Sequence, residues 1–220
     1  MAVILCLETA TTNCSVGIAQ NGELLALKED NSKGYSHAEK LHVFINEILR
    51  ETNLTVDDLD AVAVSKGPGS YTGLRIGVST AKGLCFSLDI PLISVPTLDL
   101  LAKQLEVKDK AVVVSMLDAR RMEVYSAIYD DELKQLRETK AEVLDENSFQ
   151  EYLKKSKVHF IGNGVTKFED ICKHSNAVFH NQKFPSAKEM VHIAESKYKK
   201  SDTEDVAYFE PYYLKDFIAG

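Results

Sequence analysis

A short glycine-rich loop is the part of the sequence best placed to bind an anion. Gly67-Pro68-Gly69-Ser70 follows an apolar run typical of a strand and precedes a segment with helical spacing. Backbone N–H groups at a helix N-terminus attract phosphates and carboxylates. The loop lacks the Gly-Lys-Ser/Thr of a Walker A loop and the third glycine of a dinucleotide fingerprint. Two interpretations stay open: an anion site, or a turn that only lets the chain reverse.

A stripe of small residues continues from this loop along the next predicted helix. Gly73, Gly77 and Ala81 recur every fourth residue and therefore share one helix face. A face without bulky side chains allows close approach of another helix, which would offset the roughly 0.5–1 kcal/mol that a glycine costs inside a helix. The approaching helix could belong to this chain or to a partner, and the sequence leaves both open.

No residues have the spacing of a metal site or of a nucleophilic centre. His37 and His42 lie five residues apart on a predicted helix, about 140° around its axis, so they cannot share a metal ion. The chain has no His-Glu-x-x-His motif, no Gly-x-Ser-x-Gly motif and no paired spacing among its four cysteines. The sequence therefore predicts no self-sufficient catalytic centre, no metal and no resident cofactor.

Composition and charge indicate an ordinary globular protein. Of the 220 residues, 45% are hydrophobic and 27% charged, which excludes disordered and fibrous classes. A net charge of −7 argues against a chain whose main task is to grip a nucleic acid backbone. No apolar stretch reaches the ~18 residues that cross a bilayer, and the first residues lack a signal-peptide pattern. We expect a soluble, cytoplasmic protein with no membrane contact.

Hydrophobic patterns predict the elements that hold these residues in the first half of the chain. The apolar run Val3–Leu7 favours a buried strand, and Asn21-Gly22 between two further apolar runs favours a hairpin, so a three-stranded meander is expected. Helices and strands then alternate: a helix over 36–50, a strand over 60–65, a helix over 72–88, a strand over 91–95 and a short helix from 97.

The second half contains the same kinds of element. Strands are predicted over 111–116, 123–129 and 158–162, and Ser148 and Ser186, each followed three residues later by Glu, predict helix starts. No repeat is visible in the sequence, yet the pattern predicts two α/β lobes joined near residues 103–110. We place the lobes at 1–104 and 105–220, with the tail from about residue 206 packing back on the first lobe.

Four stretches of the sequence carry a family resemblance. The longest is Gly-Pro-Gly-Ser-Tyr-Thr-Gly-Leu-Arg-Ile-Gly at 67–77. The others are Leu-Glu-Thr-Ala-Thr at 7–11, Asp-Ala-Arg-Arg-x-Glu-Val-Tyr at 118–125 and Pro-Tyr-Tyr-Leu at 211–214. Together they resemble the bacterial TsaB (YeaZ) family and its paralogue TsaD. The longest motif is shared by both, whereas the stretch at 118–125 and the short chain favour TsaB.

The resemblance implies an actin-like (ASKHA, ribonuclease H-like) α/β fold of two lobes, with mixed sheets flanked by helices. It also implies a role in forming N6-threonylcarbamoyladenosine (t6A) at position 37 of tRNAs that read codons beginning with adenine. In the family, TsaC makes threonylcarbamoyl-adenylate, TsaD transfers the threonylcarbamoyl group to tRNA, and TsaB and the ATPase TsaE are needed alongside. The implied partners are TsaD, TsaE and, through the complex, tRNA, with a weak homodimer when TsaD is absent.

Two departures from related enzymes favour a non-catalytic partner over an enzyme. TsaD carries a metal-binding His-Met-Glu-Gly-His where this chain has Thr97 to Leu101, without a histidine. Actin-like ATPases usually have a Mg-linked Asp where this chain has Glu8. We therefore interpret five residues as a vestigial nucleotide loop, with ATP or ADP expected only within the complex: Thr11, Thr12, Gly67, Gly69 and Ser70. The alternative is an actin-like ATPase or an M22-type peptidase.

The two long predicted helices of the first lobe are expected to dock TsaD. Each must bury one stripe on its own sheet, yet one is apolar over a wide arc and the other has a glycine groove beside its apolar stripe. Apolar surface on both sides of a helix indicates burial on both sides, as in a four-helix bundle with a partner. The predicted interface comprises Leu41, Phe44, Ile45, Ile48, Gly73, Leu74, Gly77, Val78 and Ala81. Gly77→Arg is expected to block docking and leave the chain folded.

We predict negligible intrinsic ATP turnover, because Glu8 replaces the Mg-linked Asp and no Walker A motif is present. The measurement is steady-state ATP hydrolysis by the purified chain. A sustained rate of roughly 1 per second or more that is abolished by a change at Thr11 or Thr12 would favour the ATPase instead. Activity that survives both changes belongs to a contaminant.

Overall fold

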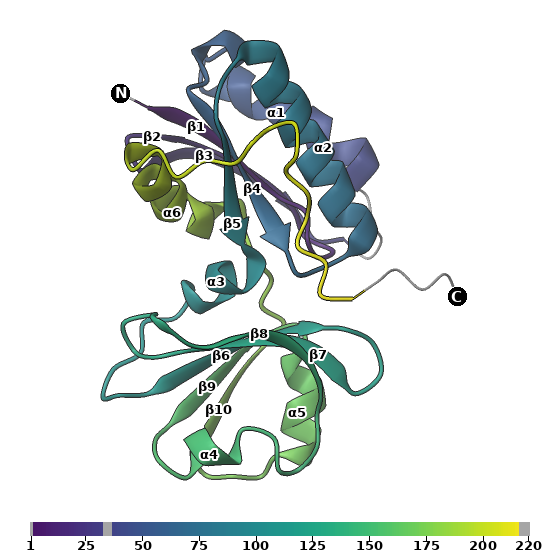
Figure 1. The fold of residues 1–220 in the computed structure, drawn as a ribbon, viewed down its shortest axis with the longest axis vertical. Helices are drawn as coiled ribbons and strands as arrows, with labels where there is room; N and C mark the ends of the chain where they lie inside the picture. Colours follow the sequence, from purple (N-terminus) through teal and green to yellow (C-terminus); the bar gives the residue numbers. More distant parts are fainter. Residues whose placement is uncertain (1, 33–36, 216–220) are drawn as a thin grey trace. The chain divides into compact units, whose positions relative to one another are not determined.

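A computed structural model describes residues 2–32 and 37–215, which form two compact units. Unit 1 draws on the chain up to Thr97 and on Pro185–Tyr213, and unit 2 is built mainly from Leu98–Phe184. Each unit contains one five-stranded mixed sheet with helices (Figure 1). No helix in the described part of the chain combines the length and the apolar character that crossing a bilayer requires.

The sheet of unit 1 has the strand order β3-β2-β1-β4-β5. Its strands are β1 (Val3–Glu8), β2 (Cys14–Gln20), β3 (Glu23–Asp30), β4 (Ala61–Gly67) and β5 (Leu92–Pro96). The first three form the predicted antiparallel meander, turned at Asn21 and Gly22 with positive φ, and β4 and β5 run parallel to β1. A short 3₁₀ helix, η1 (Val56–Asp58), precedes β4.

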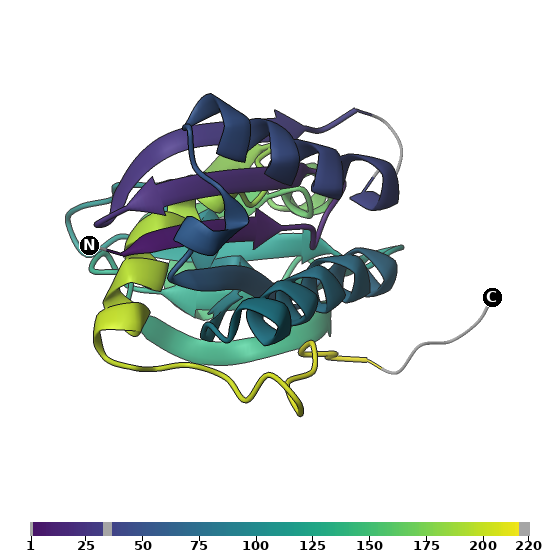
Figure 2. The same ribbon diagram turned by 90° about the horizontal axis from the view of Figure 1, so that it is seen from above.

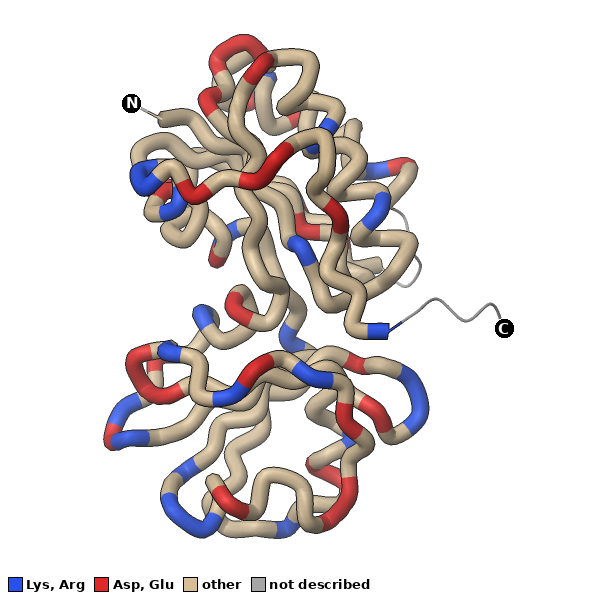
Figure 3. Tube along the Cα trace, in the orientation of Figure 1, with Lys and Arg blue, Asp and Glu red and all other residues tan. Residues whose placement is uncertain are grey.

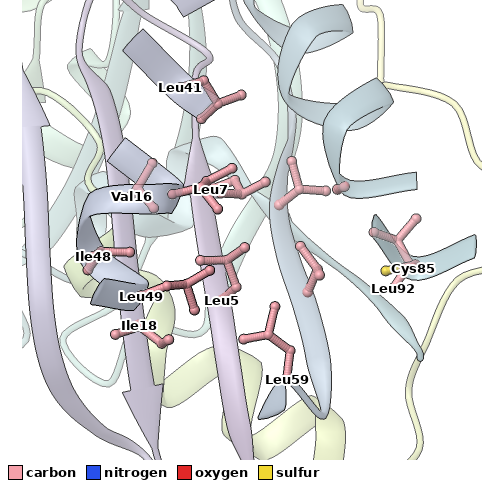
Figure 4. Packing of buried hydrophobic residues seen from close by; sticks show 14 of the residues in the cluster. Leu5, Leu7, Val16, Ile18, Leu41, Ile48, Leu49, Leu59, Cys85 and Leu92 are labelled. Atoms are coloured by element: carbon pink, nitrogen blue, oxygen red, sulfur yellow. The ribbon is translucent and has the colours of Figure 1, made fainter. Parts of the chain in front are cut away.

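Helices cover both faces of this sheet. Helices α1 (His37–Glu51) and α2 (Tyr71–Leu88) lie on one face, and α6 (Ala187–Lys199) lies on the other (Figures 1 and 2). Every residue of β1 is buried, as its continuous apolar run predicts. Leu5 and Leu7 pack against the α1 side chains Leu41 and Ile48 (Figure 4). The predicted N-cap of α1, Ser36, falls outside the described residues.

The sheet of unit 2 has the strand order β10-β9-β6-β7-β8, which is the same topology as in unit 1. Its strands are β6 (Val112–Asp118), β7 (Glu123–Tyr129), β8 (Gln135–Val143), β9 (Val158–Gly162) and β10 (Ala177–Asn181). Strands β6, β7 and β8 form an antiparallel meander, and β9 and β10 run parallel to β6. The helices are α3 (Thr97–Ala102), α4 (Gln150–Leu153) and α5 (Val165–Ile171).

Aromatic rings fill one side of the unit 2 core. The ring centroids of Phe160 and Phe168 lie 4.8 Å apart, and Phe149 packs edge-on to both at 5.5 and 5.3 Å. On the other side, Leu98 and Leu101 of α3 pack with Ile161 and neighbouring residues of the sheet. Because α3 and α5 place apolar side chains on opposite faces, this sheet is also covered on both sides.

Both helices predicted in the second half from a serine start are present, but only one of the two serines caps its helix. The Ser186 side chain accepts a hydrogen bond from the Lys188 N–H at the start of α6. Ser148 does not cap a helix: its hydroxyl accepts from the Asp145 N–H at 3.0 Å, and α4 begins only at Gln150 after Phe149. The sequence also missed β8, α5 and β10.

The compact units differ from the predicted lobes 1–104 and 105–220 because two helices leave the half of the sequence to which they belong. Helix α3 buries its leucines in the core of unit 2, and α6 buries Met190 and Ala194 against the sheet of unit 1. The tail that follows α6 stays with unit 1, where Val206 and Phe209 pack against the core. A single boundary therefore does not describe this chain.

Candidate functional site

The candidate site lies where two neighbouring parallel strands of unit 1 end. Strand β1 ends at Glu8 and β4 ends at Gly67, so the segments that follow them meet at one edge of the sheet. The Ser70 N–H donates to the Ala10 carbonyl at 2.7 Å. The Thr9 hydroxyl donates to the Gly73 carbonyl at 2.8 Å. The loop after β1 is thereby fixed to the first turn of α2.

The glycine stripe of α2 is occupied by this loop. A Cβ atom on Gly69 would lie 2.4 Å from the Ala10 carbonyl oxygen, and one on Gly73 would lie 2.1 Å from the Thr9 carbonyl oxygen. A Cβ on Gly77 would lie 2.3 Å from the Thr9 hydroxyl oxygen. The close approach that the stripe predicts is therefore made within the chain, by a loop instead of a helix. Nothing in the sequence pattern indicated that Thr9 and Ala10 would pack into the glycine stripe.

The polar groups of the predicted nucleotide loop bond to other parts of the chain. The Thr11 hydroxyl accepts from the Asn13 N–H at 3.3 Å, and the Thr12 hydroxyl donates to Asn31 Oδ1 at 2.8 Å. Ser70 is the N-cap of α2, since its hydroxyl accepts the Gly73 N–H at 3.2 Å. The structure brings Thr11, Gly69 and Ser70 to one edge of the sheet and engages each of them internally.

The C-terminal tail closes the remaining part of this loop. Gly67 has a φ of +110°, and a Cβ there would lie 2.7 Å from the Tyr212 carbonyl oxygen. The Tyr212 N–H donates to the Lys66 carbonyl at 2.7 Å. Gly67 is therefore needed both for its backbone conformation and for the close passage of the tail.

A carboxyl group lies buried beneath the loop. Glu8 is fully buried, and its Oε1 accepts the Ala10 N–H at 2.5 Å. Burial raises the pKa of Glu8 to about 7; the Ala10 N–H and the Ser65 hydroxyl lower this pKa and the charge of Glu29 raises it further. One Glu8 oxygen is therefore bonded to the loop, while Oε2 is buried and accepts no hydrogen bond from the described residues.

In the parts of unit 1 and unit 2 that the structure describes, the cysteines are buried and possible metal ligands do not cluster. Burial raises the pKa of Cys6 to about 12 and that of Cys14 and Cys85 to about 11, so these thiols stay protonated at neutral pH. No three His, Cys, Asp or Glu side chains among residues 2–32 and 37–215 come together as metal ligands. Thr97 and Leu101 are completely buried in the core.

The predicted docking residues lie inside the chain, which corrects the predicted interface. Gly73 and Gly77 face Thr9, and Phe44 is only partly buried but packs against the core. The other six side chains are at most 5% exposed: Leu41, Ile45, Ile48, Leu74, Val78 and Ala81. They fill the space between the helices and the sheet, where a partner cannot reach them. Gly77→Arg is accordingly expected to disturb the chain's own fold.

The outward faces of the same helices carry apolar side chains that the sequence pattern did not single out. Phe86 of α2 is 84% exposed and Val43 of α1 is 49% exposed. Phe86 lies one position beyond the buried Cys85, so it was hidden in an apolar run of the sequence. Both side chains point away from the core that the inward faces of α1 and α2 form.

The two units contain sheets of identical strand order, each a meander followed by two parallel strands. In unit 1 a threonine loop packs against a glycine-rich helix start. These features define a protein of the actin-like, ribonuclease H-like α/β class. Residues 32–220 match the family model described as TsaD, tRNA N6-adenosine threonylcarbamoyltransferase. The tRNA threonylcarbamoyladenosine biosynthesis protein TsaB of Escherichia coli (strain K12) is 31% identical, over 98% of this chain and 96% of its own length. The chain belongs to the TsaB (YeaZ) family.

Other relatives agree with this assignment. TsaB of Haemophilus influenzae is 29% identical over 98% of this chain and 94% of its own length. The solved structure of YeaZ from Pseudomonas aeruginosa superimposes with a TM-score of 0.83 and covers 97% of this chain and all of its own. Its sequence identity is 24%, so this likeness shows the fold.

We predict that Gly73→Ala destabilises the protein by about 3 kcal/mol or more, because the new Cβ meets a backbone oxygen that cannot move aside cheaply. Gly83→Ala on the same helix is the matched control. Its Cβ would have nothing within 4 Å, so this change should stabilise by about 0.5–1 kcal/mol. Urea unfolding of the three proteins measures both effects. Equal stabilities of the two variants would show that the loop does not occupy the glycine stripe.

We predict that the stability falls as the pH rises from about 4.5 to about 7, in part through Glu8. In this window the unfolded chain has released the Glu8 proton while the folded protein still holds it, so deprotonation favours unfolding. Glu8→Gln should remove roughly 3 kcal/mol of this pH dependence, measured by urea unfolding across the range. Glu39→Gln, on the exposed side of α1, is the control and should leave it unchanged. Identical pH profiles for wild type and Glu8→Gln would contradict the prediction.

Proposed function

We propose that this chain acts in t6A biosynthesis as a non-catalytic partner of TsaD. The relatives that match almost its whole length are named tRNA threonylcarbamoyladenosine biosynthesis proteins. The modified nucleotide would be the adenosine at position 37 of tRNAs that read codons beginning with adenine. The chemistry of transfer would belong to TsaD, and this chain would keep TsaD in a competent state.

The observation that carries this proposal is the loop packed into the glycine stripe. The loop after β1 packs tightly against the glycine stripe through Thr9 and Ala10, and the Thr9 and Thr11 hydroxyl groups bond within the chain. Thr97 and Leu101, at the positions of the TsaD histidines, are buried in the core instead of facing a metal. Both features favour a structural role over an ATPase or an M22-type peptidase.

The partner surface in this proposal is the outward side of α1 and α2. Phe86 and Val43 supply exposed apolar area there, while the inward side of both helices is already used by the core. TsaD shares the family model with this chain, so it can present equivalent helices. Without TsaD, the same surface would pair with a second copy of this chain as a weaker homodimer.

The remaining members of the pathway would act through this complex. TsaE would join it as the ATPase, and TsaC would supply threonylcarbamoyl-adenylate to it. ATP or ADP would bind only once the complex has formed, because the Thr9, Thr11 and Ser70 hydroxyl groups bond within the chain.

Reconstitution of t6A formation with purified TsaC, TsaD and TsaE, with and without this chain, tests the proposal. We expect modification only when the chain is present. Phe86→Asp should weaken TsaD binding and reduce modification, because a charge enters the apolar contact. Val143→Asp is the control: Val143 is 70% exposed at the end of β8, and its change should leave both unaffected.

Two outcomes would contradict the proposal in different ways. Full modification without the chain would remove its role in t6A formation. Normal TsaD binding and modification with Phe86→Asp would place the docking surface elsewhere on the chain.

A further inference from the structure

The turn between β6 and β7 carries two adjacent arginines in a conformation that arginine disfavours. Arg120 and Arg121 are exposed and have φ values of +70° and +47°. This left-handed region suits Gly, Asn and Asp, and costs other residues about 1–2 kcal/mol each. Among the described residues, the other successive non-glycine pair with positive φ is Asp109–Lys110, which begins with Asp. The backbone conformation of the turn therefore does not explain why both of these residues are arginine.

The turn is held rigidly on the sheet of unit 2. The Asp118 N–H donates to Asn163 Oδ1 at 3.0 Å, and Asp118 Oδ1 accepts the Arg120 N–H at 2.6 Å. Gly164 lies so close that a Cβ on it would be 3.2 Å from the Asp118 nitrogen. The Ala119 N–H closes the turn on the Glu123 carbonyl at 3.1 Å. These hydrogen bonds therefore hold the backbone that carries the two arginine side chains.

The acidic residues beside the turn are already neutralised. Asp118 pairs with Lys167 at 2.7 Å, and Glu123 pairs with Lys215 at 2.5 Å. Neither arginine side chain makes an ion pair or a hydrogen bond within residues 2–32 and 37–215 that would use its charge. In Figure 3 the turn is blue with red on either side, but the red residues are those with their own lysine partners.

The other arginines differ from this pair. Arg75 lies over the Tyr71 ring, 4.1 Å from its centroid, and Arg137 pairs with Glu142. Arg50 is exposed on α1 and stands alone in the sequence. The β6–β7 turn thus carries two successive arginines on a held backbone, and neither forms an ion pair among the described residues. Such groups bind phosphate with paired hydrogen bonds.

We propose that Arg120 and Arg121 bind phosphate groups of the tRNA backbone. The identity of the nucleic acid rests on the proposed function in tRNA modification, whereas the phosphate chemistry rests on the turn itself. Because the chain has a net charge of −7, its surface as a whole does not favour RNA, so binding depends on local groups of positive charge such as this turn. Contacts to phosphate position a nucleic acid without reading its sequence. The turn would therefore hold any tRNA in one register against the complex.

Binding of an unmodified tRNA transcript to the full chain, measured by fluorescence anisotropy at several salt concentrations, tests this proposal. The double variant Arg120→Gln, Arg121→Gln should bind about tenfold more weakly or worse. The slope of log K against log salt should fall by about 1.4–1.8, which corresponds to two lost phosphate contacts. Arg50→Gln should change neither value. Lysine at both positions should restore most of the salt slope, because the charge is kept.

Several results would overturn the proposal. These are an unchanged affinity and slope in the double variant, or no tRNA binding by the wild-type chain at low salt. Titration with ADP and with inorganic phosphate separates the sources of phosphate: loss of ADP binding with unchanged tRNA binding would assign the turn to a nucleotide. If the chain is required for t6A formation but the double variant binds RNA as the wild type does, the role of the turn is refuted and the proposed function stands. If t6A forms without the chain but the double variant loses tRNA binding, the proposed function is refuted and the role of the turn in phosphate binding stands.

Discussion

The backbone of Thr9 and Ala10 lies against the start of α2 at distances that leave no room for a β-carbon on Gly69 or Gly73. This contact ties together the ends of β1 and β4 and fixes the direction in which α2 leaves the sheet. The apolar stripe of α2, including Val78, can then reach the core next to α1. Three glycines in or beside a helix are thus the condition for the packing of the whole helical face.

The same loop also encloses the carboxyl group at the end of β1. Here Glu8 is turned into the protein and bonded to the loop that it precedes. The loop, the carboxyl group and the glycine stripe thus form one tightly packed unit, and both proposals of function place it elsewhere: on the outside of α1 and α2 and on the charged turn of unit 2.

Much of the fold could be predicted from the sequence, because local patterns of residues determine it. The apolar run of β1, the Asn21-Gly22 turn and the serine cap of α6 each act within a few residues, and each is confirmed. Strand β8 was missed because its exposed positions include Glu138 and Lys140 and its half-buried side carries Arg137, so it lacks an apolar alternation. The occupant of the glycine stripe was missed because Thr9 and Gly73 meet only through the parallel pairing of β1 and β4. Spacing along one helix shows that something approaches closely, but not what it is.

The position of α6 has a consequence for how the chain is made. The sheet of unit 1 is complete once β5 has been synthesised, yet one of its faces stays uncovered until Ala187–Lys199 arrive from the other end of the chain. At about 5–20 residues per second, a ribosome needs roughly 5–20 s to travel that far. During this time the underside of β1 is exposed in the nascent chain. Unit 1 therefore cannot close until α6 has been synthesised, although its five strands come first in the chain.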